Sequence, residues 1–303
     1  MKKTIPFLFL LFIFSGVYAQ TQNNFYTDSR PYTRWWWFAD VIDKSSVRDN
    51  LVWLKNNGFG GVEIAWVYPL NRMNKDTINY TPRQEWLSKE WSEITAYAKQ
   101  TCDSLGLGCD FTFGTLWPFG DSDVPFEEAT MNLKEKEWRQ EITASWEYPK
   151  KGYVIDHLNR KALYNYGGRI ANALKPALKG GKSGLFCDSW EVETKYLATK
   201  NFEEIFIQRY SYEITPFIDS LYSPNEPYAS VRYDYMKLIS ELVIEEFYKP
   251  FTEVSNKLGA FSRVQVSGAP CDLISGYATA DVPESEAMLF EPPFSTIPAS
   301  SAA

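Results

Sequence analysis

The sequence has 303 residues, of which 45% are hydrophobic and 23% are charged, as expected for one large folded α/β domain and too few for two. Its formal net charge of −7 argues against a nucleic-acid partner, which would need a basic stripe to bind phosphates. Aromatic residues make up 17% of the chain and include 11 tryptophans, which indicates either an aromatic core or platforms on which sugar rings stack.

Residues 1–19 have the pattern of a secretory signal peptide. Two lysines precede an apolar run over residues 5–14, and residues 17–19 have the small-x-small form of a cleavage site. The run is too short for a permanent transmembrane anchor. We therefore expect export to the periplasm or the extracellular space, with a mature chain that begins at Gln20 and a polar lead-in over residues 20–30.

The cysteines and the single histidine suggest no metal centre. The four cysteines match no zinc-binding spacing, and we expect buried free thiols, with a Cys102–Cys109 disulfide as the alternative in an exported protein. His157 is the only histidine, so a Ser-His-Asp triad could form only through it. Its polar surroundings predict a residue on the surface or at the start of a helix.

Predicted strands and helices alternate from residue 34 onward. Short apolar runs bounded by turn residues indicate strands, and apolar residues at helical spacing indicate the helices between them. Within the longest helix, Pro250 is expected to cause a kink or a break. The predicted strands cover residues 34–38, 61–66, 108–114, 184–187 and 262–268, with a sixth strand edge at 279–284, and the predicted helices cover 43–57, 84–105, a part of 152–178, 201–209, a short turn near 216, and 230–258.

This alternation is typical of βα units around a parallel sheet. An open doubly wound sheet and a (β/α)8 TIM-type barrel both fit it. No glycine-rich phosphate loop follows the first strand, where a nucleotide-binding sheet would carry one, and aromatic residues stand at the strand ends instead. We therefore predict a barrel that is incomplete, with about six strands, formed by residues 31–303 with a short excursion at about 121–160.

The strand at 184–187 leads directly into the residues with the strongest chemical potential. Asp188, Trp190 and Glu191 follow it in quick succession, and the carboxyl ends of parallel strands form the working face of such folds. An indole beside a carboxyl group removes it from water and raises its pKa, which suits a general acid. The alternative is that Asp188 caps the next helix and Glu191 lies on its surface.

Indoles and carboxylates also occur at the other predicted strand ends. Sugars need this mixture, because their apolar ring faces stack on indoles while carboxylates bind hydroxyl groups and transfer protons. The alternatives are a core role for the tryptophans, which cannot all face one way on a strand, and ordinary loop positions for the acids. The residues concerned are Trp36, Trp37, Glu63, Trp66, Trp117, Gln265, Asp281, Glu284 and Glu286.

Five motifs in this order resemble the catalytic domain of glycoside hydrolase family 106, the secreted α-L-rhamnosidases. The resemblance implies a (β/α)8 barrel, an inverting mechanism and a calcium ion near the sugar site. It also implies that Glu191 is the general acid and that Glu284 or Glu286 belongs to the base or metal-binding side. Many relatives carry a long β-rich insertion where this chain has only residues 121–183. The motifs are Arg34-Trp35-Trp36-Trp37, Gly58-Phe59-Gly60-Gly61-Val62-Glu63, Trp117-Pro118-Phe119-Gly120, Asp188-Ser189-Trp190-Glu191 and Asp281-Val282-Pro283-Glu284-Ser285-Glu286.

The sequence therefore predicts an exported inverting α-L-rhamnosidase that removes terminal rhamnose from a polysaccharide or glycoconjugate. Asp281 is the candidate calcium ligand, with Asp188, Glu284 and Glu286 as further oxygen donors. The alternatives are a non-catalytic carbohydrate-binding protein, an inactive fragment of such an enzyme, and a metal-dependent lyase. The predicted catalytic residues are Glu191, Glu284 and Glu286, and the predicted sugar-binding residues are Trp36, Trp37, Glu63, Trp117, Asp188, Trp190 and Gln265.

The last residues of the sequence bear on whether this chain forms a complete barrel domain. Ser300 and Ser301 precede alanines, a pattern that opens a helix, and the family continues into further strands. We therefore expect a fragment whose sheet has two unpaired edges and which hydrolyses rhamnosides poorly or not at all.

Overall fold

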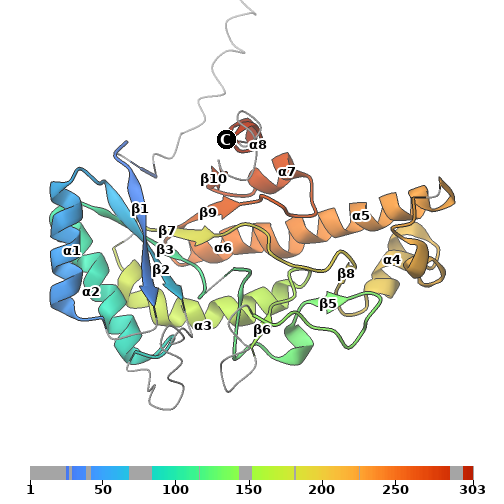
Figure 1. Cartoon of the computed structure of the whole chain (residues 1–303), viewed down its shortest axis with the longest axis horizontal. Helices are drawn as coiled ribbons and strands as arrows, with labels where there is room; N and C mark the ends of the chain where they lie inside the picture. Colours follow the sequence, from blue (N-terminus) through green and yellow to red (C-terminus); the bar gives the residue numbers. More distant parts are fainter. Residues whose placement is uncertain are drawn as a thin grey trace, which may run out of the picture.

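The computed structural model describes residues 25–26, 29–38, 42–67, 84–115, 117–142, 152–180, 182–224, 226–286 and 296–302. A six-stranded sheet lies in the middle of this part of the chain (Figure 1). The predicted signal peptide lies outside the described residues and stays a prediction. No helix in the described ranges combines the length and the apolar content that a membrane span requires.

The six strands follow one another in the sheet in the order of the sequence, as predicted. Every neighbouring pair is parallel. A doubly wound sheet reverses its strand order at a switch point, and this sheet does not; its order is that of successive strands in an α/β barrel. The described strands are compatible with part of such a barrel, and its closure is not shown. They are β1 (Tyr32–Phe38), β2 (Gly61–Val67), β3 (Gly108–Thr112), β7 (Gly184–Cys187), β9 (Phe261–Gln265) and β10 (Val282–Glu284).

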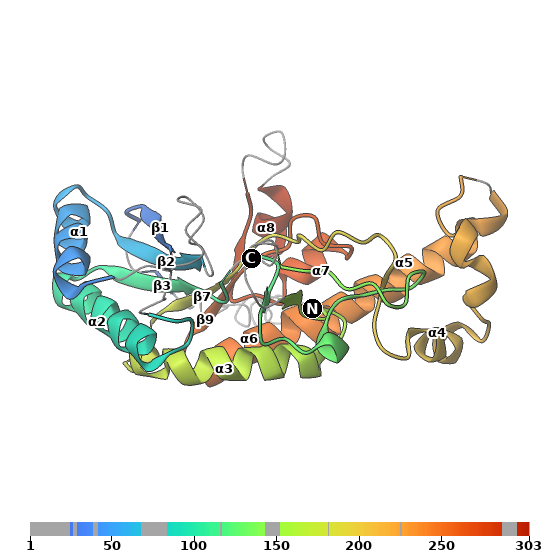
Figure 2. The same ribbon diagram turned by 60° about the horizontal axis from the view of Figure 1, so that its bottom comes forward.

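Four helices form a layer along one face of the sheet (Figure 2). Each contacts the next in chain order, α1 on α2, α2 on α3, and α3 on α6, as in the outer layer of a barrel. The opposite face of the sheet carries the charged side chains described below. The four helices are α1 (Lys44–Asn56), α2 (Lys89–Leu105), α3 (Arg160–Leu178) and α6 (Lys249–Lys257).

Local capping sets the ends of the first two helices. The Asp43 side chain accepts the N–H of Ser46 at the start of α1, and Ser88 accepts the N–H of Trp91 at the start of α2. The start of α2 therefore lies five residues after the predicted Gln84. Gly106 ends α2 with φ of 66°, a left-handed conformation that costs glycine little.

The long helix predicted over residues 230–258 is continuous but irregular. It consists of α5 (Ala229–Val243), a π-helical turn η5 (Ile244–Tyr248) and α6. The π turn lies directly before Pro250, which lacks an N–H and whose ring clashes with the carbonyl four residues earlier. The wider turn relieves that clash and buries Phe247 and Tyr248 against the sheet.

The connections carry short additional elements. In the predicted excursion, β4 (Gly120–Asp121) pairs with β6 (Tyr153–Val154), and β5 (Met131–Asn132) pairs with β8 (Leu197–Ala198), both antiparallel. This second pair ties the excursion to the chain after β7. The remaining elements are η1 (Phe126–Glu128), α4 (Phe202–Tyr210), η3 (Thr215–Ser220), η4 (Glu226–Tyr228), α7 (Leu273–Tyr277) and α8 (Ile297–Ala302).

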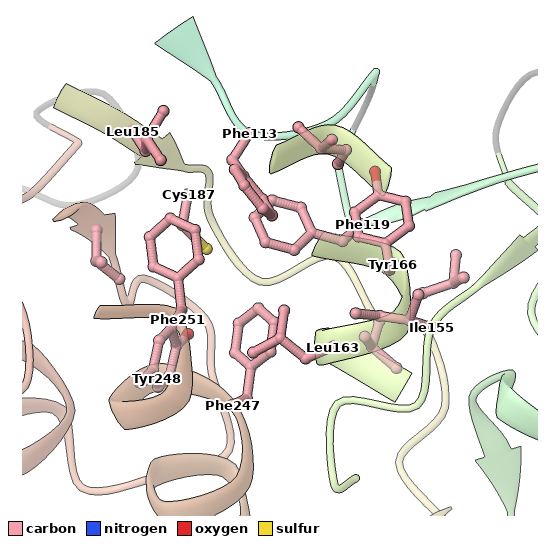
Figure 3. Packing of buried hydrophobic residues seen from close by; sticks show 14 of the residues in the cluster. Phe113, Phe119, Ile155, Leu163, Tyr166, Leu185, Cys187, Phe247, Tyr248 and Phe251 are labelled. Atoms are coloured by element: carbon pink, nitrogen blue, oxygen red, sulfur yellow. The ribbon is translucent and has the colours of Figure 1, made fainter. Parts of the chain in front are cut away.

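Aromatic rings fill the space between the sheet and the helices (Figure 3). The Phe119 ring lies 5.5 Å from Phe113, 5.6 Å from Phe247 and 5.7 Å from Phe251, and it stacks on Tyr166 at 5.8 Å. Burial of each such side chain stabilises the fold by roughly 1.5–3 kcal/mol. The core therefore joins β3, α3 and the π turn beneath the end of β7.

His157 belongs to this core, so its predicted surface position is wrong. The buried ring lies 4.4 Å from Phe247 and 5.0 Å from Trp190, and its Nδ1 lies 2.8 Å from the Ile155 carbonyl oxygen. Burial lowers the pKa of His157 to about 4. The neighbouring Asp156 is also buried, so the polar residues beside His157 in the sequence do not indicate a surface position.

The cysteines are free thiols, as predicted. Cys102, Cys109 and Cys187 are buried, whereas Cys271 is only partly buried. Burial raises the pKa values of the Cys109, Cys187 and Cys271 thiols, which makes them poor nucleophiles.

The Tyr32 ring lies at the amino-terminal end of the sheet, against two glycines that leave space for it. A Cβ atom on Gly108 would lie 1.7 Å from the Tyr32 hydroxyl oxygen, and one on Gly61 would lie 2.4 Å from the Tyr32 ring. We expect Gly108→Ala to lower the free energy of unfolding by about 1–3 kcal/mol, since the core must shift to admit a methyl group. Urea unfolding measures this change.

Gly168→Ala is the matched control. Gly168 lies inside α3, and its Cβ would meet nothing within 4 Å. Alanine there should stabilise the protein by up to about 1 kcal/mol through helix propensity. Equal effects of the two substitutions would show that Tyr32 does not occupy this position.

Asp156 makes the stability of the fold depend on pH. Its buried carboxylate accepts the N–H of Leu158 at 2.9 Å and the hydroxyl of Thr199. Burial raises its pKa to about 7 in spite of these bonds, compared with about 3.9 in an unfolded chain. The folded protein therefore holds the Asp156 proton more tightly, so its contribution to stability is lost as pH rises through the folded pKa.

We expect wild type to lose roughly 2–3 kcal/mol of stability relative to Asp156→Asn between pH 5 and pH 8, because the amide carries no charge to bury. Unfolding in urea at both pH values measures the difference. Asp219→Asn, at an exposed partner of Lys134, should show no such pH dependence. A constant difference between wild type and Asp156→Asn would contradict the prediction.

Candidate active site

Ion pairs join the strands on the face opposite the helix layer. Arg263 on β9 is their centre. Its Nη1 donates to Glu63 on β2 and to Asp110 on β3, both at 3.0 Å, and its Nε and Nη2 donate to Glu284 on β10 at 3.0 and 2.6 Å. The Gly184 N–H also donates to Asp110, at 2.6 Å. One guanidinium on β9 thus binds three other strands.

Arg34 extends this network to the end of β7. Its Nε lies 3.0 Å from Glu63 Oε1, and its Nη1 donates to Asp188 Oδ2 at 3.0 Å. The guanidinium also lies 4.6 Å from the centre of the Phe186 ring. Asp188 accepts the N–H of Ser189 at 2.8 Å through its other oxygen. The sugar-binding residue predicted at position 188 is therefore held by an arginine.

Glu63 has little capacity left for a ligand. It is buried, and beside the two arginines it accepts the hydroxyl of Thr112 at 2.9 Å. Burial of a carboxylate is tolerated only with such partners. Glu63 therefore holds neighbouring strands of the candidate site together. Its predicted contact with a sugar stays a prediction.

Glu191 lies at the exposed rim, three residues beyond Asp188. Burial, and then the negative charges of Asp188 and Glu286, raise its pKa, while a hydrogen bond from the Ser189 side chain opposes the shift. A raised pKa lets a carboxyl group keep a proton near neutral pH, as a general acid must. The charge of Glu286 thus contributes to the raised pKa of Glu191.

The backbone around Glu191 is fixed by its neighbours. The Gln140 side-chain amide donates to the Glu191 carbonyl at 3.0 Å, and the Trp190 N–H donates to the Ser267 carbonyl at 2.9 Å. The excursion and the loop after β9 thus hold the segment from both sides. Glu284, by contrast, is bound through its Oε2 to two nitrogens of Arg263.

The tryptophans of β1 separate onto two faces. Trp36 is 37% exposed, and its ring lies 5.6 Å from Trp117, in the loop after β3. The Trp37 ring lies in the core, 6.1 Å from Trp66. Alternation along a strand produces this division. Trp36 and Trp117 form an aromatic pair beside the ion-pair network, whereas Trp37 lies outside the candidate site.

Gln265 is the last residue of β9 and pairs in register with Glu284. Its side chain is only 7% exposed, and Oε1 has no hydrogen-bond partner among the described residues. A buried acceptor without a partner costs about 1–3 kcal/mol. This buried oxygen lies at the carboxyl end of its strand, on the side of the candidate site. Trp190 is half-buried, with its ring packed edge-on against His157.

Arg34 and Arg263 are functional-site residues that the sequence analysis did not single out by role. A signal was present, because a charged residue inside an otherwise apolar buried strand needs a partner. By this criterion only Glu63 stood out in the sequence as a charged residue in a buried strand. Its partners could not be named, because Arg263 lies 200 positions away from it.

The described residues do not test the calcium ion that the resemblance implies. No group of three or more His, Cys, Asp or Glu side chains in the described ranges could hold a metal ion. Asp281 precedes β10, and its Oδ2 accepts the N–H and the hydroxyl of Ser262 at 2.9 and 3.2 Å. It therefore lies at the amino-terminal end of the strand, whereas Asp188 and Glu286 lie at carboxyl ends. Calcium stays a prediction, and no step below uses it.

Comparison with known proteins supports the fold. No protein-family model and no curated protein matches the sequence. The chain is similar to a rhamnosidase from Novosphingobium sp. PP1Y, with a TM-score of 0.63 and 10% identity over 86% of this chain and 48% of that one. It is also similar to a polyextremophilic β-galactosidase from the Antarctic haloarchaeon Halorubrum lacusprofundi, with a TM-score of 0.53 and 10% identity over 84% and 39%.

The chain thus spans about half the length of that rhamnosidase. At 10% identity the likeness shows a fold shared with glycoside hydrolases. Membership of family 106 stays a prediction.

The network predicts a large cost for the loss of Arg263. We expect Arg263→Gln to lower the free energy of unfolding by about 3–5 kcal/mol, because Glu63, Asp110 and Glu284 would lose their shared cation. Chemical denaturation measures the change. Arg160→Gln, which removes an exposed pair with Glu246, is the control and should cost about 1 kcal/mol or less. Similar losses for both variants would contradict a central role for Arg263.

Proposed function

We propose that this protein is a glycoside hydrolase of the α-L-rhamnosidase type, acting on the rhamnose-containing side chains of polysaccharides or glycoconjugates. The observation that carries the proposal is the Glu191 carboxyl group at the strand ends, with a raised pKa and the charges of Asp188 and Glu286 beside it. The fold shared with glycoside hydrolases supports it. The specificity for rhamnose rests on the motif resemblance.

In the proposed reaction Glu191 donates its proton to the glycosidic oxygen as the bond to the sugar breaks. Glu286 removes a proton from the water that attacks the sugar carbon from the opposite side, which inverts its configuration. Such a pair of carboxyl groups stands roughly 6.5–9.5 Å apart to leave room for the water. We assign the base to Glu286 rather than Glu284, because Arg263 already binds Glu284 through two nitrogens.

The sugar would bind between the aromatic pair and the ion-pair network. Rhamnose carries a methyl group in place of one hydroxymethyl group, and this apolar side suits stacking on Trp36 or Trp117. The Gln265 Oε1 atom, which has no hydrogen-bond partner among the described residues, would accept one of its hydroxyls. The negative charge of Asp188, which binds Arg34, would favour the protonated form of Glu191.

We further propose that the protein acts after export, on the evidence of the signal-peptide pattern in residues 1–19. We also keep calcium as a proposal, on the resemblance alone. Loss of activity with a chelator, restored by calcium and not by zinc, would support the ion.

The test of the function is Glu191→Gln with an aryl α-L-rhamnoside. We expect the amide to lower kcat by a factor of about 10²–10⁴, because it has no proton to donate, and to leave rhamnose binding unchanged in calorimetry. In wild type, kcat should fall as pH rises through the pKa of Glu191.

Glu204→Gln is the control, since Glu204 is an exposed glutamate of α4, and it should retain turnover. Rhamnose binding by wild type without hydrolysis of any aryl glycoside would favour the non-catalytic carbohydrate-binding protein. Unsaturated products that absorb in the ultraviolet would instead indicate a lyase.

A further inference from the structure

We propose that Gln140 is a positioning residue for the general acid, because its side-chain amide holds the backbone at Glu191 and Glu193. This inference rests on the proposed function and extends it to a residue of the excursion, 51 positions before Glu191 in the chain. It assigns the excursion a part in catalysis, in addition to its part in the fold.

Both ends of the Gln140 amide bind the segment that carries the acid. Its Nε2 donates to the Glu191 carbonyl oxygen at 3.0 Å, and its Oε1 accepts the Glu193 N–H at 2.9 Å. The amide offers a donor and an acceptor, so it pairs with this segment as the peptide group of a neighbouring strand would. The side chain is only 5% exposed, and burial strengthens both hydrogen bonds.

The segment depends on such partners because it has no regular structure of its own. Residues 188–194 follow β7 without forming a helix or a strand. Before Glu191, the Trp190 N–H donates to the Ser267 carbonyl at 2.9 Å, and after it the Asn132 side-chain amide donates to the Thr194 hydroxyl at 2.9 Å. Gln140 binds between these two points, at the acid itself.

Gln140 is in turn fixed by the excursion. Its carbonyl oxygen accepts the Val154 N–H at 2.9 Å, and both neighbouring residues form antiparallel bridges to other parts of the excursion. The amide therefore has a fixed position from which to hold Glu191. A general acid must meet one oxygen atom of the substrate, and a displacement of about 1 Å can lower the rate about 100-fold.

Gln84 offers a matched control, since its side chain makes the same pair of bonds elsewhere. Its Nε2 donates to the Ile42 carbonyl oxygen at 2.8 Å, and its Oε1 accepts the Ile42 N–H at 2.9 Å. Ile42 lies between β1 and α1, and neither residue belongs to the candidate site. Methionine in place of either glutamine keeps the length of the side chain and removes both bonds.

The first experiment follows hydrogen exchange of the Glu193 backbone amide by NMR and does not depend on catalysis. We expect Gln140→Met to raise the exchange rate at least about tenfold, because the amide loses its partner. Gln84→Met should leave the rate within about twofold of wild type. An unchanged rate in Gln140→Met would overturn the proposed role of Gln140, whatever the activity of the protein.

The second experiment measures turnover of an aryl α-L-rhamnoside. Gln140→Met should lower kcat about 10–100-fold and change KM less than about twofold. The fall of kcat with rising pH should move to lower pH, because a freer Glu191 is better hydrated and has a lower pKa. The charges of Asp188, Glu286 and Glu193, which act on Glu191, are all retained in this variant. Gln84→Met should keep the wild-type kcat and pH profile.

The two measurements separate the inference from the function. Faster exchange in Gln140→Met with the kcat and pH profile of wild type would overturn the positioning role and keep the proposed function. A wild type that hydrolyses no aryl glycoside would overturn the proposed function and the catalytic role of Gln140 together, and the exchange rates would then decide only whether Gln140 holds the segment.

Discussion

The pairing of Arg263 with Glu63, Asp110 and Glu284 is the constraint on which the rest of the structure depends. A buried guanidinium and three carboxylates are tolerated only while each has its partners, so the strands that carry them must keep one register. Gly184 belongs to the same constraint, because a Cβ there would lie 2.6 Å from the Arg263 side chain. The parallel sheet therefore has a charged interior face and an aromatic face toward the helices.

The candidate site grows out of this network at its carboxyl-terminal edge. Glu63 and Arg34 carry the pairing to Asp188, and Asp188 in turn acts on Glu191 at the rim. The acidic residues thus fall into two groups according to their burial. Glu63, Asp110 and Glu284 are bound by arginines and hold the strands, while Glu191 is exposed. This division explains how one strand end can supply both a structural ion pair and the candidate proton donor.

The helix side supports the same rim by apolar packing. The π turn before Pro250 brings Phe247 beneath the end of β7, and the neutral His157 ring packs between Phe247 and Trp190. Trp190 is then held through its backbone N–H by the Ser267 carbonyl. A rigid aromatic wall at this point suits a site in which the acid must meet one oxygen atom of the substrate.

The sequence by itself determined the order of strands and helices, because buried parallel strands are short apolar runs and helices show their caps and periodicity locally. It also singled out Glu191 and Glu286 as candidate catalytic residues, since both follow strands. Tertiary structure alone decided which acids are engaged and which rings are exposed. Glu63 meets Arg263 across 200 positions, and the buried side chains of Trp37 and His157 depend on which face of a strand or loop the core covers. Such pairings arise from register and packing between distant segments, which no local pattern encodes.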